Sequence, residues 1–305
     1  MMPVVPPAYR GRFAPSPSGP LHFGSLIAAV GSYLQAKSQQ GQWLVRMEDI
    51  DSPRMQAGAA DGILRTLERY QLLWDGDVWV QSHRLERYQQ VLDLFKQQQL
   101  TYACNCNRSR IQSLPHGYDS FCRDKQLVEG SLAWRLKAPS TAIAFTDQLV
   151  GEVHIPAALA AEDYILKRRD GLFAYQLVVV VDDLDQGITE VVRGADLIDL
   201  TTRQQALFQL LGAQPPDYLH LPLAVIEPGF KLSKQNHAPA VEHWPVSQTL
   251  TAVLQFLGHP PPAELAGAGA AELLAWACTN WQIKQIPHQN EQRAADFLPK
   301  AADFL

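Results

Sequence analysis

Residues 12–25, RFAPSPSGPLHFGS, connect a predicted strand to a predicted helix and hold one histidine among three prolines and two glycines. His22 lies just ahead of the helix, where unpaired backbone N–H groups and the positive end of the helix dipole attract anions. Gly19 and Gly24 let a ligand approach the backbone closely. We therefore expect His22 to donate a hydrogen bond to a phosphate, while a purely structural histidine is the alternative that this motif alone leaves open.

A second segment with phosphate-binding chemistry is FKLSKQNHA, residues 230–238, which directly follows a predicted strand. Lys231 and Lys234 flank a serine there, and lysine ammonium groups bind phosphate as point charges. Taken singly, such a segment is equally typical of a solvated surface loop. The two segments are far apart in the sequence, so only the fold could bring them to one site.

Three of the four cysteines, Cys104, Cys106 and Cys122, lie within nineteen residues. Clustered thiolates are soft ligands that hold zinc well, and disulfides are rare in the cytosol. The cluster therefore predicts a structural zinc site, with ordinary reduced cysteines as the alternative. From the chemistry alone we expect His116 as the fourth ligand, because Cys3His sites are common.

Composition and charge narrow the class of protein. The 305 residues are 47% hydrophobic, and the densest apolar run, LVVVV at 177–181, is too short to span a bilayer. The N-terminal sequence does not resemble a signal peptide, so we expect a soluble cytoplasmic protein without membrane contact. The net charge of −5 argues against a general nucleic-acid binder, although residues 101–140 hold six Lys and Arg against three Asp and Glu.

Hydrophobic periodicity predicts strands alternating with helices in two parts of the chain. One strand ends near Phe13, and a helix capped by Ser25 and closed by Gly41 follows it. The unbroken apolar run AYQLVVVVDD, residues 174–183, predicts a central parallel strand. Further strands are expected at 42–48, 131–137, 142–147 and 218–226, and further helices at about 55–71, 84–99, 199–211 and 271–282.

This alternation predicts an α/β fold, a doubly wound parallel sheet that carries an insertion. Ligands of such sheets bind beyond the carboxyl ends of the strands, which is where His22 is expected. We divide the chain into a first catalytic half at 1–100, an inserted zinc-containing subdomain at 101–165, a second catalytic half at 166–245 and a short helical C-terminal region at 246–305.

The histidine-bearing segment at 12–25 resembles the HIGH-type signature of class I aminoacyl-tRNA synthetases. The lysine-bearing segment at 230–238 resembles their KMSKS-type signature, and the two follow in the same order along the chain. Three further stretches are similar to the glutamyl type of that family, and the resemblance extends over about residues 10–245. These stretches are RMEDIDSPR at 46–54, GITEVVRGADLI at 187–198 and HLPLAVI at 220–226.

The resemblance implies a Rossmann-type catalytic core and a ligase that activates L-glutamate with ATP and Mg²⁺. It implies that His22, Lys231 and Lys234 are catalytic, and that Ser25 and Lys234 bind ATP. Arg12 and Tyr175 would hold the side-chain carboxylate of glutamate, Arg193 its other carboxylate and Glu48 its ammonium group. The complete set expected to bind glutamate is Arg12, Phe13, Ala14, Pro15, Ser16, Glu48, Tyr175 and Arg193.

Two further expectations come from the resemblance. For the metal site it favours Tyr118 over His116, which gives the ligand set Cys104, Cys106, Tyr118 and Cys122. Because 71 residues follow Lys234, we expect no helical anticodon-binding domain. The chain is therefore most similar to a truncated branch of the family, which implies transfer of glutamate to the queuosine base in the anticodon of tRNA(Asp) by a monomeric enzyme.

Three alternative functions are compatible with parts of the sequence. One is an ordinary glutamyl-type synthetase that charges the tRNA 3′ end. Another is a catalytically inactive, tRNA-binding paralogue, which the presence of His22, both lysines and Glu48 disfavours. A nucleotidyltransferase for a small molecule would share the fold, but it would not explain the residues that match a glutamate pocket.

Overall fold

The computed structural model describes residues 8–115, 117–128, 130, 132–138, 143–232 and 238–298. His116 and Lys234, both singled out above, lie outside these ranges. In the described part of the chain, no helix is both long enough and apolar enough to cross a membrane.

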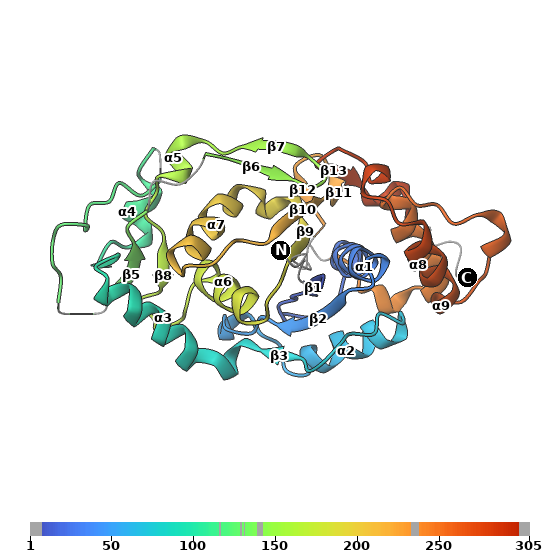
Figure 1. Ribbon diagram of the computed structural model, residues 1–305, viewed down its shortest axis with the longest axis horizontal. Helices are drawn as coiled ribbons and strands as arrows, with labels where there is room; N and C mark the ends of the chain where they lie inside the picture. The colour runs from blue at the N-terminus through green and yellow to red at the C-terminus, as the bar shows by residue number, and fades with distance from the viewer. Residues whose placement is uncertain are drawn as a thin grey trace, which may run out of the picture.

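Strands and helices alternate along the described residues. The strands are β1 (Arg10–Phe13), β2 (Gln42–Met47), β3 (Trp79–Val80), β4 (Thr101–Cys104), β5 (Ala133–Leu136), β6 (Ala144–Asp147), β7 (Gly151–His154), β8 (Ile165–Lys167), β9 (Glu190–Gly194), β10 (Asp217–Leu221), β11 (Leu223–Glu227), β12 (Phe230–Lys231) and β13 (Glu291–Arg293). The α-helices are α1 (Phe23–Ser38), α2 (Ala59–Arg69), α3 (Leu85–Gln97), α4 (Arg108–Gln112), α5 (Ala157–Ala160), α6 (Tyr175–Asp185), α7 (Thr201–Leu210), α8 (Val246–Phe256) and α9 (Ala270–Asn280). Figure 1 shows an elongated molecule with β1, β2, β9 and β10 near its middle, α4 and β5 at one end and α8 and α9 at the other.

A parallel sheet lies at the centre of the molecule. β1 pairs with β2 and β2 with β3, all in parallel, and β9 pairs in parallel with β10. The backbone N–H of Thr189 donates to the carbonyl of Arg10 over 2.9 Å, which sets the start of β9 beside β1. The α/β fold with a parallel sheet that the sequence predicts is therefore confirmed.

The two faces of this sheet differ in chemistry. Successive side chains of a strand point to opposite faces, and Trp43 and Val45 of β2 join the hydrophobic core that includes α1. Arg46, the residue after Val45, points the other way, and its guanidinium lies 2.8 Å from Asp183 of α6. One face is thus covered by a helix through apolar contacts and the other by a helix that carries charge.

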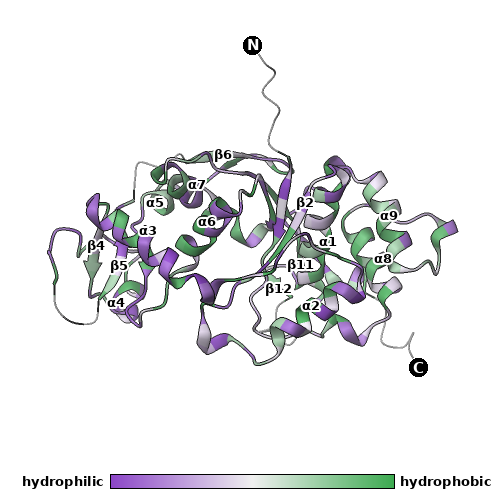
Figure 2. Cartoon of the chain, turned by 60° about the horizontal axis from the view of Figure 1, so that its bottom comes forward, coloured by the Kyte–Doolittle hydropathy of each residue, from purple (hydrophilic) through white to green (hydrophobic). Residues whose placement is uncertain are grey.

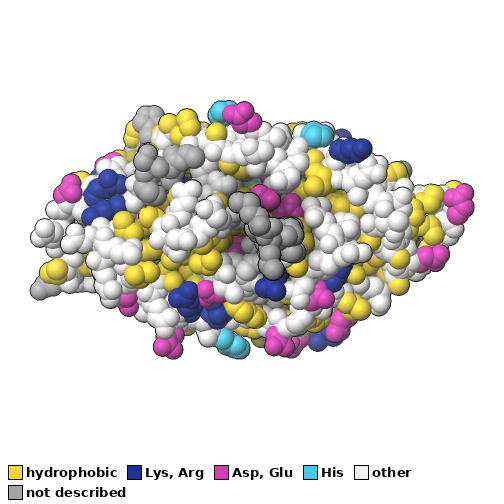
Figure 3. Space-filling view, in the orientation of Figure 1, with side chains coloured by type: hydrophobic (Ala, Val, Ile, Leu, Met, Phe, Trp, Pro, Cys, Tyr) yellow, Lys and Arg dark blue, Asp and Glu magenta, His cyan; other side chains and the backbone are white. Residues whose placement is uncertain are grey.

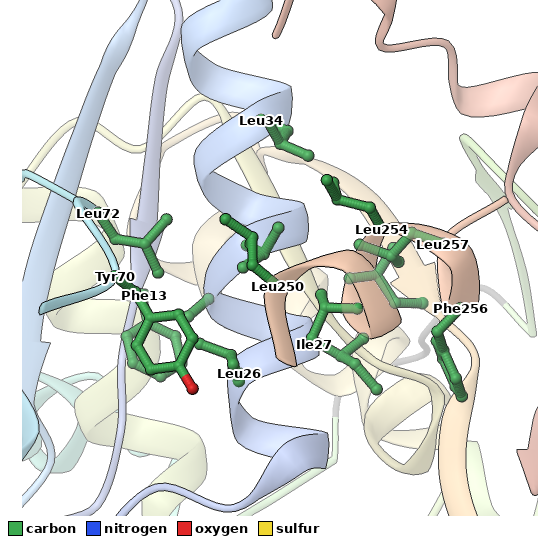
Figure 4. Close-up of a cluster of buried hydrophobic side chains, with 14 of the residues drawn as sticks. Phe13, Leu26, Ile27, Leu34, Tyr70, Leu72, Leu250, Leu254, Phe256 and Leu257 are labelled. Atoms are coloured by element: carbon green, nitrogen blue, oxygen red, sulfur yellow. The ribbon is translucent and has the colours of Figure 1, made fainter. Parts of the chain in front are cut away.

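Helix α1 is the centre of the larger hydrophobic core. The hydropathy colouring of Figure 2 shows hydrophobic residues along α1 and along the helices α8 and α9 beside it. Burying each large apolar side chain stabilises the fold by about 1.5–3 kcal/mol, so α8 and α9 hold α1 firmly in place. Figure 4 shows the packing, with Leu26 of α1 beside Phe13 and Tyr70 on one side of the helix and Ile27 and Leu34 on the side of Leu250, Leu254 and Phe256.

The prediction of a central strand at residues 174–183 is wrong, because nearly all of this segment lies in helix α6. Residues Gln176 to Asp183 are all buried, so the helix is apolar nearly all round and its sequence shows no amphipathic period. Its run of valines favours extended backbone only weakly, and tertiary packing overrides that preference. The strand beside β1 is instead β9, which was not predicted.

The single strand predicted at 218–226 is in fact two strands. Pro222 separates β10 from β11, and proline lacks the N–H that a continuous sheet ladder requires. β10 stays in the parallel sheet, whereas β11 pairs with β12 and β13. Because β12 runs antiparallel to β11, the chain reverses its direction before it reaches Lys231.

Among the described residues of 101–167, the strands form two small antiparallel sheets. β4, β5 and β8 make one of them, and the hairpin of β6 and β7 makes the other. The hairpin packs on the central sheet, because Phe145 of β6 shares a buried cluster with Val191 of β9 and Tyr218 of β10. Part of this middle segment therefore contacts the strands that position the site.

Candidate active site

A cavity of about 800 Å³ opens at the carboxyl ends of β1, β2, β9 and β10, beside the start of α1. We call it the main cavity. It brings together the histidine segment and the first lysine of the KLSK segment, which are distant in the sequence. Its lining includes every predicted phosphate- or glutamate-binding residue that the structure describes, namely Arg12, Phe13, Ala14, Pro15, Ser16, His22, Ser25, Glu48, Tyr175, Arg193 and Lys231.

His22 is the N-cap of α1, so the prediction that Ser25 caps this helix is wrong. The His22 Nδ1 atom accepts the backbone N–H of Ser25 over 3.3 Å, and the helix begins at Phe23. An imidazole can take the capping role of a hydroxyl because it also carries an acceptor. In the neutral ring the proton then sits on Nε2, the nitrogen that can donate to a phosphate.

Lys231 lies on β12 at the rim of the main cavity. Its ammonium group is 2.5 Å from a carboxylate oxygen of Asp196, and both side chains are partly exposed. Asp196 also lines the cavity and was not predicted. The pair fixes the start of the KLSK segment against the loop that follows β9.

A cluster of buried charges forms the floor between the sheet and α6. Arg12 donates to both carboxylate oxygens of Asp183, from Nε over 3.1 Å and from Nη2 over 3.3 Å. Arg46 lies 2.8 Å from Asp183, 3.6 Å from Asp182 and 3.5 Å from Glu48. A third arginine, Arg84, lies 2.7 Å from Asp182, so the cluster opposes three arginines to three carboxylates.

Glu48 is the carboxylate of this cluster that lines the main cavity. Burial raises its pKa to about 7, against the lowering effect of the charges on Arg46 and Arg12. Asp183 behaves in the opposite way, because both arginines hold its pKa below the usual value despite its burial. An arriving ammonium group beside Glu48 would favour its ionised form.

The two arginines of the predicted glutamate site differ in their partners. Arg12 is already neutralised by Asp183. Arg193 donates only to uncharged groups, and among the described residues no carboxylate oxygen lies within 4 Å of its guanidinium. Tyr175, the first residue of α6, lies at the same cavity, and burial raises the pKa of its hydroxyl. Arg193 is therefore the stronger attractor for an anion.

A second, smaller cavity of about 450 Å³ adjoins the first, and we call it the side cavity. Two exposed arginines, Arg54 and Arg168, line it together with apolar side chains, and both lie within 4 Å of a carboxylate oxygen of Asp51. Four residues, Ser16, Glu48, Arg54 and Tyr175, line both cavities. The remaining lining of the side cavity is Ile50, Asp51, Gln81, Ile165, Arg168, Phe173 and Ala174.

The predicted metal ligands lie together beyond the end of β4. The sulfurs of Cys104, Cys106 and Cys122 are all within 4.8 Å of one another. The Tyr118 hydroxyl is 3.5 Å from the Cys104 sulfur, and the sulfurs of Cys106 and Cys122 are also 3.5 Å apart. Three thiols that converge in this way fit the sulfur ligands of a tetrahedral zinc site, and the Tyr118 oxygen lies beside them.

Two arginines accompany this cluster. Arg135 Nε lies 3.4 Å from the Cys104 sulfur, and Arg110 Nη1 lies 3.5 Å from that of Cys106. Their positive charges reduce the repulsion between neighbouring thiolates, which a bound cation would reduce further. The sequence pattern had singled out the cysteines, but not these arginines.

The sequence also missed the acidic residues that organise the floor of the site. Asp182 and Asp183 end the apolar run at 174–183 that was predicted as a strand. The signal was their charge inside an otherwise hydrophobic segment, since buried carboxylates are almost always paired. With the segment taken as a strand, their approach to Arg12 and Arg46 could not be foreseen.

Comparison with known proteins agrees with this geometry. A family model described as tRNA synthetases class I (E and Q), catalytic domain, matches residues 8–257. Over 281 residues, 92% of this chain and 93% of the relative, the chain is 57% identical to a protein of Serratia proteamaculans named glutamyl-Q tRNA(Asp) synthetase. A protein of Escherichia coli with the same name is 53% identical over 279 residues, 92% of this chain and 91% of the relative.

Among solved structures, the chain is similar to the glutamate-tRNA synthetase of Elizabethkingia anophelis. The TM-score is 0.78 at 20% sequence identity, and the match covers 94% of this chain and 68% of the other. A glutamate tRNA ligase from Elizabethkingia meningosepticum gives the same TM-score at 21% identity, covering 94% of this chain and 67% of the other. At these identities, the likeness shows the shared fold.

Proposed function

The chain belongs to the family of class I tRNA synthetases for glutamate and glutamine, and from this membership we propose that it activates L-glutamate with ATP and transfers it to the queuosine base of tRNA(Asp). The relatives that match nearly the whole chain carry names with this substrate. The observation that carries the proposal is the main cavity, in which phosphate-binding and glutamate-binding groups from both halves of the chain meet.

Glutamate would bind with its charges matched to the cavity. Arg193, which has no carboxylate partner among the described residues, attracts one substrate carboxylate, and Arg12 with Tyr175 receives the other. Glu48 receives the ammonium group, since its carboxylate lines the cavity and the guanidinium of Arg46 lies 3.5 Å away from it. Glutamine would leave one of the arginines without an anion, which costs binding free energy.

ATP would bind at the other end of the cavity, near the start of α1. His22 Nε2 and the positive end of the helix dipole face this end, and Lys231 lies across from them on β12. A carboxylate oxygen of glutamate attacks the α-phosphorus, the bond to the bridging oxygen breaks, and pyrophosphate leaves. Lys234 and Lys231 would offset the charge that gathers on the phosphates, and Mg²⁺ would enter with ATP.

Transfer requires a second entrance, and we assign it to the side cavity. It meets the main cavity at Glu48 and Tyr175, beside the proposed glutamate site. Its apolar side chains suit a base, and Arg54 and Arg168 suit a neighbouring phosphate. A hydroxyl of the cyclopentene diol of queuosine then attacks the glutamyl carbonyl carbon, the bond to the AMP phosphate breaks, AMP leaves, and the hydroxyl proton is released.

An exposed basic surface supports contact with RNA beyond the active site. Phe121 is 49% exposed, and the charged groups of Arg110 and Lys125 lie 4.2 and 3.1 Å from the centre of its ring. Exposed aromatic rings beside cations bind unstacked bases of RNA loops. On the face in Figure 3, Lys and Arg side chains lie near the end of the molecule that carries α4 and β5 in Figure 1.

We further propose that Cys104, Cys106, Tyr118 and Cys122 hold one structural zinc ion, which would stabilise this basic end of the molecule. In this proposal, residues 101–165 form the inserted subdomain, 1–100 and 166–245 the two halves of the catalytic domain, and 246–305 a short helical region. We also propose that the enzyme acts as a monomer. A tRNA substrate places the enzyme in the cytoplasm.

Glutamate-dependent exchange between ATP and labelled pyrophosphate, run with and without tRNA, tests the activation step. We expect exchange with glutamate and much slower exchange with aspartate or glutamine. Equal rates with glutamate and glutamine would contradict the assignment of the arginines, and no exchange with any of the three would contradict the proposed activity.

A further inference from the structure

Arg193 is held by a network of buried, uncharged partners. Its Nε donates to His220 Nε2 over 3.0 Å, and its Nη1 donates to Gln204 over 2.7 Å. Its Nη2 donates to the Leu197 carbonyl over 3.2 Å and to the Thr201 hydroxyl over 2.9 Å. These described partners use four of the five N–H groups, so one N–H on Nη1 remains for a ligand in the main cavity.

His220 can accept from Arg193 in only one protonation state. Its Nδ1 lies 2.7 Å from a carboxylate oxygen of Asp147, and both side chains are fully shielded from water. With Nδ1–H donating to this carboxylate, Nε2 keeps a lone pair and faces the Nε–H of Arg193. Burial, together with the nearby charge of Arg193, lowers the pKa of His220 and favours this neutral ring despite the opposing effect of Asp147.

Asp147 is in turn fixed at the end of the β6–β7 hairpin. One carboxylate oxygen accepts the backbone N–H groups of Leu149 and Val150, both over 2.9 Å. The other accepts the Nδ1–H of His220 and also its backbone N–H, over 3.1 Å. All of these contacts favour the ionised carboxylate, which can only accept from His220 and therefore selects its tautomer.

We propose that His220 and Asp147 are positioning residues that hold the Arg193 guanidinium in the orientation needed to bind a substrate carboxylate. Neither residue lines the main cavity, so both act through Arg193. The inference rests on the proposed binding of glutamate by Arg193. It gives the β6–β7 hairpin a role in amino-acid binding, because Asp147 belongs to β6.

The network also explains how the buried positive charge of Arg193 is balanced. Asp147 balances the positive charge of Arg193 across a neutral ring, without a carboxylate in direct contact with the guanidinium. A directly bound carboxylate would compete with the substrate for the same N–H groups, as Asp183 does at Arg12. The relay therefore lets Arg193 remain buried and charged while it still attracts an anion.

Two substitutions at one position separate the two bonds of His220. His220→Asn keeps a donor near the position of Nδ1 for Asp147 but lacks an acceptor that reaches Arg193. His220→Gln places an amide oxygen near the position of Nε2, where it can accept from Arg193. In the exchange assay we expect His220→Asn to raise the KM for glutamate about tenfold or more, with the KM for ATP within about twofold of the unmodified protein, and His220→Gln to restore most of the affinity.

Asp147→Asn provides a second route to the same test. Its amide would face Nδ1 of His220 with an N–H group, so the ring proton would move to Nε2. Nε2–H and the Nε–H of Arg193 would then both be donors, and the hydrogen bond between them would be lost. We expect the KM for glutamate to rise here too, although Asp147 does not reach the cavity. His259→Asn is the matched control, because His259 is equally buried, donates or accepts at both ring nitrogens and lines neither cavity.

Thermal melting of each variant checks folding before the kinetics are compared. The inference is overturned if His220→Asn and Asp147→Asn leave the KM for glutamate within about twofold of the unmodified protein, or raise the KM for ATP equally. It is also overturned if His220→Gln is no better than His220→Asn. Loss of glutamate-dependent exchange in the unmodified protein would instead contradict the proposed function, on which this inference rests.

Discussion

Arg12 and Asp183 form a two-point ion pair that is shielded from water, with Nε 3.1 Å from Oδ1 and Nη2 3.3 Å from Oδ2. The pair joins β1 to α6 across the face of the sheet opposite α1. It also limits how Arg12 can meet a substrate, since only its Nη1 edge remains to face a carboxylate. The same aspartate contacts Arg46, so one side chain fixes both of these arginines.

Removing the charge of Asp183 should therefore destabilise the protein. Asp183→Asn leaves Arg12 and Arg46 buried with one carboxylate fewer, and breaking such a pair lowers the free energy of unfolding by about 3–5 kcal/mol. Asp185→Asn on the same helix is the control, because its partners Arg84 and Arg87 lie nearer to solvent and its loss costs at most about 1 kcal/mol. Urea titration measures both, and equal losses would contradict the central place of Asp183.

Glutamate binding should weaken as the pH falls through 7. Burial raises the pKa of Glu48 to about 7, and only its ionised form attracts the substrate ammonium group, which stays charged over this range. The ionised fraction of such a group falls about tenfold between pH 8 and pH 6, so the Kd for glutamate should rise by about that factor. Calorimetric titration measures it, and Glu48→Gln should bind weakly with no such dependence. A flat profile for the unmodified protein would contradict the role of Glu48.

The sequence predicted the parallel α/β fold and the residues around the main cavity because both depend on local features. Strand and helix periods are visible in short windows, and the residues around His22 and those around Lys231 each belong to one short stretch of the sequence. It could not predict α6, since a helix buried on all sides has the same unbroken apolar pattern as a buried strand. That error hid the pairing of Arg12 with Asp183.

The relay from Asp147 through His220 to Arg193 was beyond sequence reasoning for a different reason. Each of its members lies on a separate strand, β6, β10 and β9, and only the packing of the hairpin on the sheet brings them together. The stretch HLPLAVI at 220–226 resembles the family and includes His220. Asp147, which completes the network, is 73 positions from His220 in the sequence. Contacts at such separation leave no local signal.

The cysteine cluster should bind one zinc ion per chain. Elemental analysis of protein purified without chelators measures the content, and we expect Cys106→Ser to lose the metal and to loosen the segment around α4. Tyr118→Phe and His116→Ala then identify the fourth ligand. Loss of zinc in the histidine variant alone would show that His116, and not Tyr118, completes the site. Metal-free protein would contradict the site altogether.

The side cavity should serve the transfer step and not activation. Arg168→Gln removes an exposed positive charge there, so we expect glutamate-dependent exchange to change little while kcat/KM for transfer to tRNA falls about tenfold. Arg65→Gln is the charge-matched control, since Arg65 lies exposed on α2 and lines neither cavity. Equal effects of the two variants on transfer would show that Arg168 acts only through its positive charge and would contradict its role in the side cavity.

The identity of the acceptor is the central claim, and transfer of labelled glutamate to defined tRNA tests it most directly. The protein is incubated with ATP and glutamate and with tRNA from cells that make queuosine or from cells that cannot, and nuclease digestion then locates the label. We expect label only in the first tRNA and only in the fragment that carries the anticodon. Equal labelling of both tRNAs, with the label on the 3′-terminal adenosine, would contradict the account and assign the protein to the synthetases that charge the tRNA end.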